Sequence, residues 1–567
     1  MATSASMLAV KVNSKGELIA SCCRCAHIAL TGDGPVASFS LKPEGASTER
    51  SKESYGQILK SSALIGGSQV ANIVIGVVRT KAMAVLLGPA GFGLFGLYGS
   101  IQNLTQSIAG MGINSSGVRQ IAAAAGSGDK DRIAQTASVL RSTAIALGVL
   151  GAGLLLAFSR QISRVTFGNT EHTAAVSLLS MAVFFGLVSG GQGALIQGMR
   201  RIGDLAKMNV LGAFFGLCAS IPLVYFFRQK GVVPSLVVVA AMGILTSWWY
   251  SRKTGIQPAQ VTLSQVREET SVLLKLGSAF MASGLMTMGV AYAVRTMILR
   301  TLGLPATGLY QAAWTLGGLY VGFILQAMGA DFYPRLTASI DNHQETNRLV
   351  NEQTLIGILL AGPGVLATLT FAPLIMTLFY SARFAAAVGI LRWVCLGAAL
   401  QVITWPMGFI VVAKGRQSWF FFSELCWALV AIALAWVSLR WFGLNGAGIA
   451  FFGSYVFHLF LTYPIARWLS RFHWSHENKQ VGTALLALIG MVFAGFHLVP
   501  VFWAASFGVL AAITSAAYSL RVLFRLVPED RLPPSMRRLL AKFHPLTLEF
   551  KGTPAAGQGI ASRGLGQ

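Results

Sequence analysis

The sequence predicts an all-α polytopic membrane protein, with two six-helix lobes in a parallel repeat and two extra C-terminal transmembrane helices. The first observation is composition: 54% of the 567 residues are hydrophobic, 11% are charged, and the mean hydropathy is +0.62. Soluble domains carry roughly 25% charged residues. The other two observations are regularly spaced apolar runs and an internal repeat. Together they exclude a soluble globular domain.

Apolar runs long enough to cross a bilayer, about 20 residues each, recur along the chain after Ser54. We count about fourteen of them. Their expected starting points are Gln57, Gly93, Thr136, Ala174, Leu205, Val232, Ser271, Gly308, Thr354, Ala385, Trp419, Asn445, Val481 and Phe502. An even number of crossings places both ends of the chain on the same side of the membrane.

The first and seventh runs carry the same short motifs in the same order, which indicates an internal repeat. The matching pairs are Leu59–Lys60 with Leu274–Lys275, Val78–Thr80 with Val294–Thr296, Leu87–Pro89 with Leu302–Pro305, and Gly93–Tyr98 with Gly308–Tyr310. A repeat after six crossings starts both copies on the same membrane side. We therefore expect two lobes related by an axis along the membrane normal, with a cavity between them.

The basic loops and the repeat set the expected domain organisation. Lys and Arg gather in alternate loops, and the positive-inside rule then places both termini in the cytoplasm. The formal net charge of +24 is accordingly attributed to orientation in the membrane and not to nucleic-acid binding. We predict a disordered extension or mis-assigned start at 1–54, an N-lobe at 55–253, a cytoplasmic linker at 254–269, a C-lobe at 270–476, two further transmembrane helices at 477–524 and a basic cytoplasmic tail at 525–567.

Several cations lie inside the apolar runs, where a charge is costly. The candidates are Arg79, Lys81, Arg295 and Arg300. Too few acidic residues lie in these runs to pair with them, so we predict a wet, basic cavity that takes an anion, and arginine suits phosphate. Arg79 and Arg295 lead because they match in the repeat. The alternative is that each side chain only reaches the lipid headgroups from a helix end.

Uncharged polar side chains on the same runs complete the candidate site. Gln69, Asn103 and Gln106 in the first lobe, and Gln311 in the second, could hydrogen-bond sugar hydroxyls, and Trp314 could stack on a sugar face. Amides also hold membrane helices together, and aromatic residues mark membrane interfaces. A purely structural role for these residues therefore stays open.

We expect no metal, no cofactor and no catalytic motif. The cysteines of Cys22–His27 have no second half-site with zinc-like spacing. The sequence shows no phosphate-binding Gly-rich loop with Lys, no metalloprotease pair of histidines and no nucleophile elbow. No loop between the runs is long enough to carry a catalytic domain. We therefore expect a transporter and not an enzyme.

The chain resembles the Wzx-type O-antigen and polysaccharide flippases, which are lipopolysaccharide biosynthesis translocases of the MOP exporter superfamily. The resemblance is carried by "VVRTKAMAVLLGPAGFGLFGLYGSI" (Val77–Ile101), "GINSSGVRQIA" (Gly112–Ala122), "LIQGMRRIGDLAK" (Leu195–Lys207) and the layout of the spans. It implies a MATE-like fold whose central cavity opens alternately to the two sides. The related peptidoglycan-precursor flippases share a similar first-span pattern whose arginine lines the cavity, and this implies the same role for Arg79.

The resemblance further implies translocation of an undecaprenyl-pyrophosphate-linked oligosaccharide, an O-antigen or related repeat unit, across the bacterial cytoplasmic (inner) membrane without covalent chemistry. The expected partners are this polyprenyl-pyrophosphate-linked glycan, the lipid bilayer, and a polysaccharide polymerase or chain-length regulator; nucleic acid is not expected. Three alternatives remain. A lipid-modifying enzyme would need catalytic acids or histidines near a membrane face, where Glu424 and His458 are the candidates. A MATE-type drug or cation exporter would be expected to place a carboxylate in the cavity of its first lobe. A flippase of a peptidoglycan lipid precursor fits the arginines equally well.

Overall fold

The computed structural model describes residues 10–12, 18–20, 45–257, 259 and 263–526. The chain divides into two units, Met1–Lys60 and Ser61–Gln567. In the first unit, strands β1 (Val10–Val12) and β2 (Leu18–Ala20) pair in antiparallel fashion. Most of the predicted N-terminal extension, the Cys22–His27 cluster, part of the predicted linker and nearly all of the basic tail lie outside the described residues.

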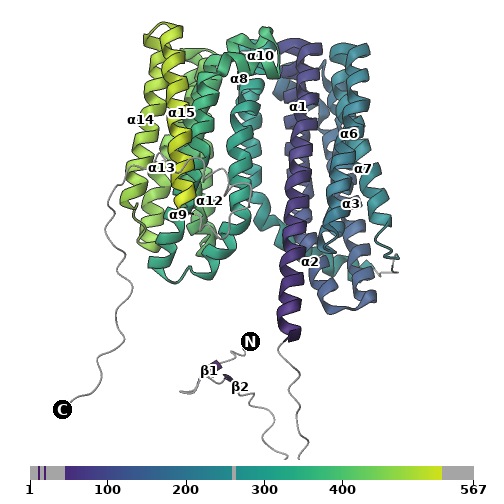
Figure 1. Ribbon diagram of the computed structural model, residues 1–567. Helices are drawn as coiled ribbons and strands as arrows, with labels where there is room; N and C mark the ends of the chain where they lie inside the picture. Colours follow the sequence, from purple (N-terminus) through teal and green to yellow (C-terminus); the bar gives the residue numbers. More distant parts are fainter. Residues whose placement is uncertain (1–9, 13–17, 21–44, 258, 260–262, 527–567) are drawn as a thin grey trace, which may run out of the picture. The chain divides into compact units, whose positions relative to one another are not determined.

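Helices form nearly all of the described part of the second unit (Figure 1). The long helices are α1 (Gly45–Gly110), α3 (Lys130–Ala157), α5 (Thr173–Gly198), α6 (Ile202–Phe227), α7 (Val232–Arg252), α8 (Leu263–Ala338), α9 (His343–Thr370), α11 (Val388–Ala413), α12 (Gln417–Phe442), α13 (Asn445–Ser470), α14 (His476–Leu498) and α15 (Val501–Leu526). The shorter elements are α2 (Ile113–Ser127), α4 (Ser159–Phe167), α10 (Ala372–Phe379) and the 3₁₀ turns η1 (Arg228–Gly231) and η2 (Ala382–Ala387).

The chain is a multi-pass membrane protein, as the sequence predicts. Eleven helical segments of the described chain are long and apolar enough to cross a bilayer. Three of them, Gly66–Gly110, Ile202–Arg252 and Gly284–Gly329, are 45, 51 and 46 residues long, about twice the length that one crossing needs. Ile202–Arg252 contains two of the predicted starting points, Leu205 and Val232. The other two segments belong to α1 and α8, and each of these helices also contains two of the predicted starting points. Counting two crossings in each of the three long segments reconciles the eleven segments with the larger number of expected crossings.

Helices α1 and α8 each reverse direction at one glycine. Gly88 has a φ of 65° and Gly303 a φ of 85°, a backbone region that glycine adopts without steric cost. In α8, Arg295 Nε donates to Gln311 Oε1 at 2.6 Å, although these residues would lie about 24 Å apart along a straight helix. The two halves therefore form an antiparallel hairpin. The repeated sequence motifs around Gly88 and Gly303 therefore mark the points where the two helices reverse.

Helix lengths repeat along the chain. Helices α3, α4, α5 and α6 have 28, 9, 26 and 26 residues, and α9, α10, α11 and α12 have 28, 8, 26 and 26. Helices α3 and α9 also start alike, because the side chains of Asp129 and Asn342 cap them by accepting hydrogen bonds from backbone N–H groups of the first turn. The two hairpins and these matching series confirm the predicted pair of lobes.

Most helix contacts lie within one lobe or the other. In the first lobe α3 packs on α5, and α7 packs on both α5 and α6. In the second lobe α13 packs on α11 and α12, while α14 and α15 pack on α9. Helix α8 contacts elements of both lobes. Figure 1 shows the same division, with α3, α6 and α7 on one side of α1 and with α9 and α12 to α15 beyond α8.

The lobes meet where α1 and α8 reverse, and we call this the hairpin end. Gly93 and Gly308, which match in the repeat, face each other here. A Cβ atom on Gly93 would lie 2.5 Å from the carbonyl oxygen of Leu304, and one on Gly308 would overlap the carbonyl oxygen of Pro89. The absence of side chains at both positions therefore lets the two hairpins cross in direct backbone contact.

Aromatic packing extends this contact. The Phe92 ring lies 5.4 Å from the Tyr380 ring and 5.7 Å from the Phe384 ring, measured between centroids, with edge-on geometry. All three side chains are fully or almost fully buried. Phe92 belongs to α1, whereas Phe384 lies in η2 of the second lobe, so the hairpin end of the protein is closed by apolar contacts between the lobes.

Candidate functional site

Arg79 is a half-buried cation whose Nε is an unsatisfied donor. It lies on α1 before the reversal at Gly88, and its guanidinium stands 6.0 Å from the centroid of the Phe95 ring. Its Nε is buried and has no hydrogen-bond partner. Within the described residues it makes no ion pair. Because a buried donor without an acceptor is unfavourable by about 1–3 kcal/mol, this atom indicates a place for water or an anionic ligand.

Arg295, its counterpart in the repeat, has protein partners. Its Nε donates to Gln311 Oε1 at 2.6 Å and its Nη1 donates to the Ala291 carbonyl oxygen at 2.8 Å. The guanidinium also lies 5.8 Å from the centroid of the Tyr310 ring, which in turn packs on Trp314 at 5.8 Å. Three predicted site residues, Arg295, Gln311 and Trp314, are therefore brought together, but by contacts inside the α8 hairpin.

Arg300 is bound to a neighbouring helix of the other lobe. Its Nη2 donates to the carbonyl oxygens of Arg164 and Val165, at 2.5 and 2.7 Å, and its Nε donates to that of Thr166 at 3.2 Å. These carbonyls end α4, where the helix dipole favours a cation. The Thr166 hydroxyl also lies 2.6 Å from the hydroxyl of Tyr292 on α8.

The remaining predicted residues lie apart from these three arginines. Lys81 and Asn103 are exposed on the two halves of α1. Gln106 Nε2 donates to the Ala182 carbonyl oxygen at 3.1 Å, which joins α1 to α5. Gln69 lines a cavity within the first lobe. As a substrate-binding set, the nine residues stay a prediction, and among the three arginines Arg79 is the one whose Nε is left without a protein partner.

The cavity that contains Gln69 has a volume of about 510 Å³ and lies between α1, α2, α5 and α6. Its polar lining includes Asn114 from α2 and Asn209 from α6, neither of which the sequence analysis singled out. Asn114 does belong to the quoted "GINSSGVRQIA" motif. The sequence signal was therefore visible, but no periodicity ties α2 and α6 to α1 before the helices pack.

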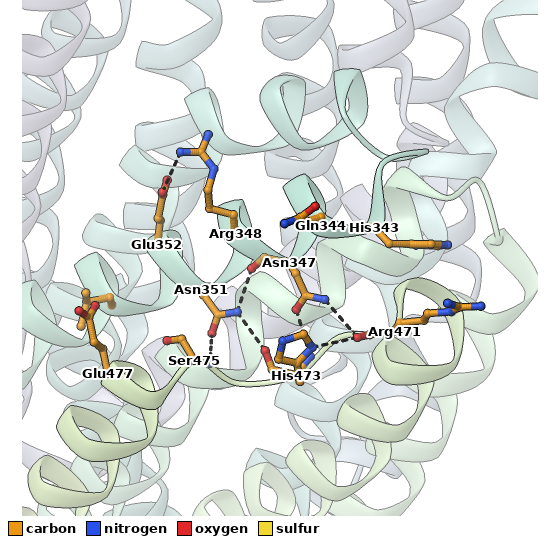
Figure 2. Close-up of a pocket in the computed structure, with 11 residues that line it drawn as sticks. His343, Gln344, Asn347, Arg348, Asn351, Glu352, Arg471, His473, Ser475 and Glu477 are labelled. Carbon is orange, nitrogen blue, oxygen red and sulfur yellow. Dashed lines mark hydrogen bonds and ion pairs between the residues drawn. The ribbon is translucent and has the colours of Figure 1, made fainter. Parts of the chain in front are cut away.

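A second cavity, of about 450 Å³, lies where α9 begins and α13 gives way to α14 (Figure 2). Asn347 and Asn351 hold the connecting segment in place: Asn347 Nδ2 donates to the Arg471 carbonyl oxygen at 3.1 Å, and Asn351 Oδ1 accepts from the Ser475 N–H at 2.8 Å. Arg348 forms an ion pair with Glu345 at 2.6 Å. Asn347, Asn351 and Arg348 thus have protein partners, and the two asparagines act as a structural clamp on the connecting segment.

Comparison with known proteins identifies the family. A sequence model of the polysaccharide biosynthesis protein family matches residues 82–389, more than half of the chain. The chain belongs to this family. It is also 22% identical, over 411 residues, to the lipid III flippases of Escherichia coli (strain K12) and Shigella flexneri, and the alignment covers 71% of this chain and 97% of each relative.

Solved structures of the MOP superfamily have the same fold. The lipid II flippase MurJ in an inward closed conformation superposes with a TM-score of 0.63 at 12% identity, covering 82% of this chain and 99% of that chain. An inward-facing multidrug resistance MATE family transporter gives a TM-score of 0.60 at 15% identity, covering 71% and 99%. The MATE-like fold predicted from the sequence is confirmed.

Proposed function

We propose that this member of the polysaccharide biosynthesis protein family is a flippase of the Wzx type. It translocates an undecaprenyl-pyrophosphate-linked oligosaccharide, an O-antigen or related surface polysaccharide unit, across the cytoplasmic membrane. The observation that carries the proposal is the buried, unpartnered Nε of Arg79 on a membrane-spanning helix. The family match and the likeness to the lipid III flippases support it.

The pyrophosphate is the part of the substrate that is most costly to move out of water. An ionised phosphate that enters an apolar environment without partners loses many kcal/mol of hydration, and the same holds for an isolated guanidinium. Bringing the two together offsets both penalties, and the planar guanidinium fork donates two parallel hydrogen bonds to phosphate oxygens. Arg79 has its Nε free for such a bond. The undecaprenyl chain remains in the bilayer, so only the polar head has to pass through the protein.

Acidic residues bear on the drug-exporter alternative. The segments Gly66–Gly110 and Thr173–Gly198 contain no Asp or Glu. In α3 and α6 the acidic residues, Asp131 and Asp204, stand in the first turn, and Asp204 pairs with Arg201 at 2.8 Å. A first lobe without a carboxylate inside its spans favours an anionic substrate. A peptidoglycan lipid precursor also carries pyrophosphate, so the anion site does not distinguish the two substrates. They differ in their glycans, and transport of one glycan but not the other would distinguish the two functions.

The contacts at the hairpin end suggest how transport proceeds. We take the N-terminus as cytoplasmic, from the distribution of basic loops, which makes the hairpin end the outer one. Transport then requires the lobes to part along the Gly93–Gly308 crossing and around Phe92. Substrate binding shifts the population between the two arrangements only to the extent that it binds them with different affinity.

The decisive experiment is leaflet translocation of a fluorescent undecaprenyl-pyrophosphate-linked glycan in proteoliposomes. We expect Arg79→Ala to abolish translocation while the protein still inserts and folds. The matched control is Arg440→Ala, which removes the same charge from an exposed arginine that packs 3.9 Å from the Trp436 ring centroid, and we expect it to be active. Translocation by wild type but equal activity of Arg79→Ala would reject the anion site. Absence of translocation by folded wild type would reject the function.

A further inference from the structure

The cavity of the first lobe is lined by uncharged polar groups. Its volume is about 510 Å³, and none of its lining residues is Asp, Glu, Lys, Arg or His. Four carboxamide side chains line it, one each from α1, α2, α5 and α6: Gln69, Asn114, Gln197 and Asn209. A cavity without charge does not select a cation or an anion. Carboxamides instead offer both donors and acceptors, which is what a neutral ligand with hydroxyl groups requires.

These carboxamides are not used by the protein itself. Within the described residues, no hydrogen bond joins Gln69, Asn114, Gln197 or Asn209 to a protein partner. The clamp in Figure 2 gives the contrast, because there Asn347 and Asn351 are bound to the α13–α14 connection. Carboxamides that hold helices together make such bonds; those in the first-lobe cavity remain available to a ligand.

Glycines on α5 keep the cavity open. Gly186, Gly190 and Gly193 all line it, at a spacing that places them on one face of the helix. A Cβ on Gly190 would lie 2.5 Å from Asn114 Oδ1, so glycine there leaves room for that side chain. A Cβ on Gly193 would approach only Met208 Cε, at 3.5 Å. A larger side chain at Gly193 would therefore fill the cavity without meeting backbone.

A line of polar groups on α1 connects the cavity with Arg79. Gln69, Asn72 and Arg79 lie on one broad face of the helix, with about 15 Å of helix between the first and the last. Asn72 Oδ1, like Arg79 Nε, is buried without a hydrogen-bond partner. Buried polar atoms in native proteins are almost always satisfied by protein or water. A polar molecule lying along this face would satisfy both atoms.

We infer that the first-lobe cavity binds neutral sugar residues of the lipid-linked substrate while Arg79 holds its pyrophosphate. The inference rests on the proposed function and extends it. The glycan is selected as a neutral oligosaccharide by carboxamide contacts, which lie about 15 Å along α1 from the anion site. The glycan therefore enters the protein along the first lobe.

The test uses the full-length protein in lipid nanodiscs and two probes. One probe is bare undecaprenyl pyrophosphate, and the other carries a neutral trisaccharide of one N-acetylglucosamine and two hexoses. We expect wild type to bind the glycan-bearing probe about tenfold more tightly, and Gly193→Leu to lose that difference. Asn114→Leu should lose part of it. The matched control is Gly153→Leu on α3, where an added Cβ meets nothing within 4 Å, and it should retain the full difference.

The outcomes separate the two proposals. Loss of the glycan-dependent difference in Gly193→Leu, with the affinity for bare lipid retained, supports the cavity as the sugar site. Equal affinity of wild type for the two probes overturns the inference and leaves the proposed function intact. The same holds if Gly193→Leu and Asn114→Leu lose affinity for both probes to the same extent. Failure of correctly folded wild type to bind either probe overturns both.

Discussion

Arg79 and Arg295 stand at matching places in the two halves of the protein, but only Arg295 is bound by protein groups. The difference arises from one position. Gly93 matches Gly308 in the repeat, so the counterpart of Gln311 is Gly96. Gln311 Oε1 accepts from Arg295, and the same side chain lies against Gly96, where a Cβ would stand 2.7 Å from Oε1. The first lobe has no carboxamide at that position, and Arg79 Nε lacks a partner.

The comparison shows how a duplicated charge acquires two roles. In one half, a neighbouring carboxamide satisfies the guanidinium and turns it into a packing element of the α8 hairpin. In the other half, the missing carboxamide leaves a donor whose partner has to come from outside the protein. A buried cation without a counter-charge is unstable unless it gains one. Arg79 therefore suits a transported anion better than Arg295 does.

The first prediction breaks the equivalence by removing the charge of Arg79. Arg79→Gln should lower translocation of undecaprenyl-pyrophosphate-linked glycan by about 100-fold, because a contact to the pyrophosphate worth about 2.7 kcal/mol disappears. Its free energy of unfolding should be unchanged or higher, because a half-buried, unpaired charge is gone. Translocation in proteoliposomes and unfolding in detergent measure the two effects. A variant that unfolds more readily, with activity lost only in proportion, would identify Arg79 as a structural residue.

The second prediction makes Arg295 resemble Arg79. Gln311→Leu leaves the buried Arg295 Nε without its acceptor. We expect the free energy of unfolding to fall by about 2 kcal/mol, as is typical when a hydrogen bond to a charged group is lost. Reversible unfolding in mixed micelles measures it. The matched change in an exposed carboxamide of α1, Gln69→Leu, should leave the free energy of unfolding nearly unaffected.

The third prediction removes both members of the α8 pair. Arg295→Leu/Gln311→Leu should be more stable than Gln311→Leu alone and should lie within about 1 kcal/mol of wild type, since replacing both buried polar partners by apolar groups is often nearly neutral. A double-mutant cycle built on the four unfolding curves gives the coupling energy. Additive single effects would show that Arg295 and Gln311 act independently, contrary to the geometry.

The fourth and smallest effect concerns Arg300, the cation that joins the lobes. Arg300→Gln removes a charge from the last carbonyls of α4, a contribution of about 0.3–1 kcal/mol. We expect the population with a parted hairpin end to rise by about two- to fivefold. Spin labels on α4 and α8 read out this population as a distance distribution. An unchanged distribution would mean that Gly93, Gly308 and Phe92 hold the hairpin end alone.

Much of the fold could be predicted because the signals are local. Apolar runs mark membrane crossings wherever they occur, and the repeated "VRT" and leucine–glycine motifs mark where two hairpins begin and turn. The structure adds that Gly88 and Gly303 are single-residue reversals. It also shows that Gly93 and Gly308 meet across the lobes. The sequence marked these last two as a matching pair, but a match along the chain carries no information about contact.

The candidate site was predictable only in part. Composition and periodicity place Arg79, Arg295 and Arg300 inside apolar runs and require each to have a partner. The identity of that partner depends on which helices pack together. Arg295 finds Gln311 because α8 folds back on itself, and Arg300 finds the end of α4 because the lobes meet there. Asn114 and Asn209 join Gln69 only when α2 and α6 enclose the same cavity.

Hydropathy and charge are properties of short segments, so they are enough to predict a repeated, multi-pass helical membrane protein with more cations than acids inside its spans. Which cation is satisfied and which keeps an open donor is a property of the packed helices. This property depends on side chains brought within hydrogen-bond reach by helix packing, where the difference between Gly96 and Gln311 places a carboxamide beside Arg295 and none beside Arg79.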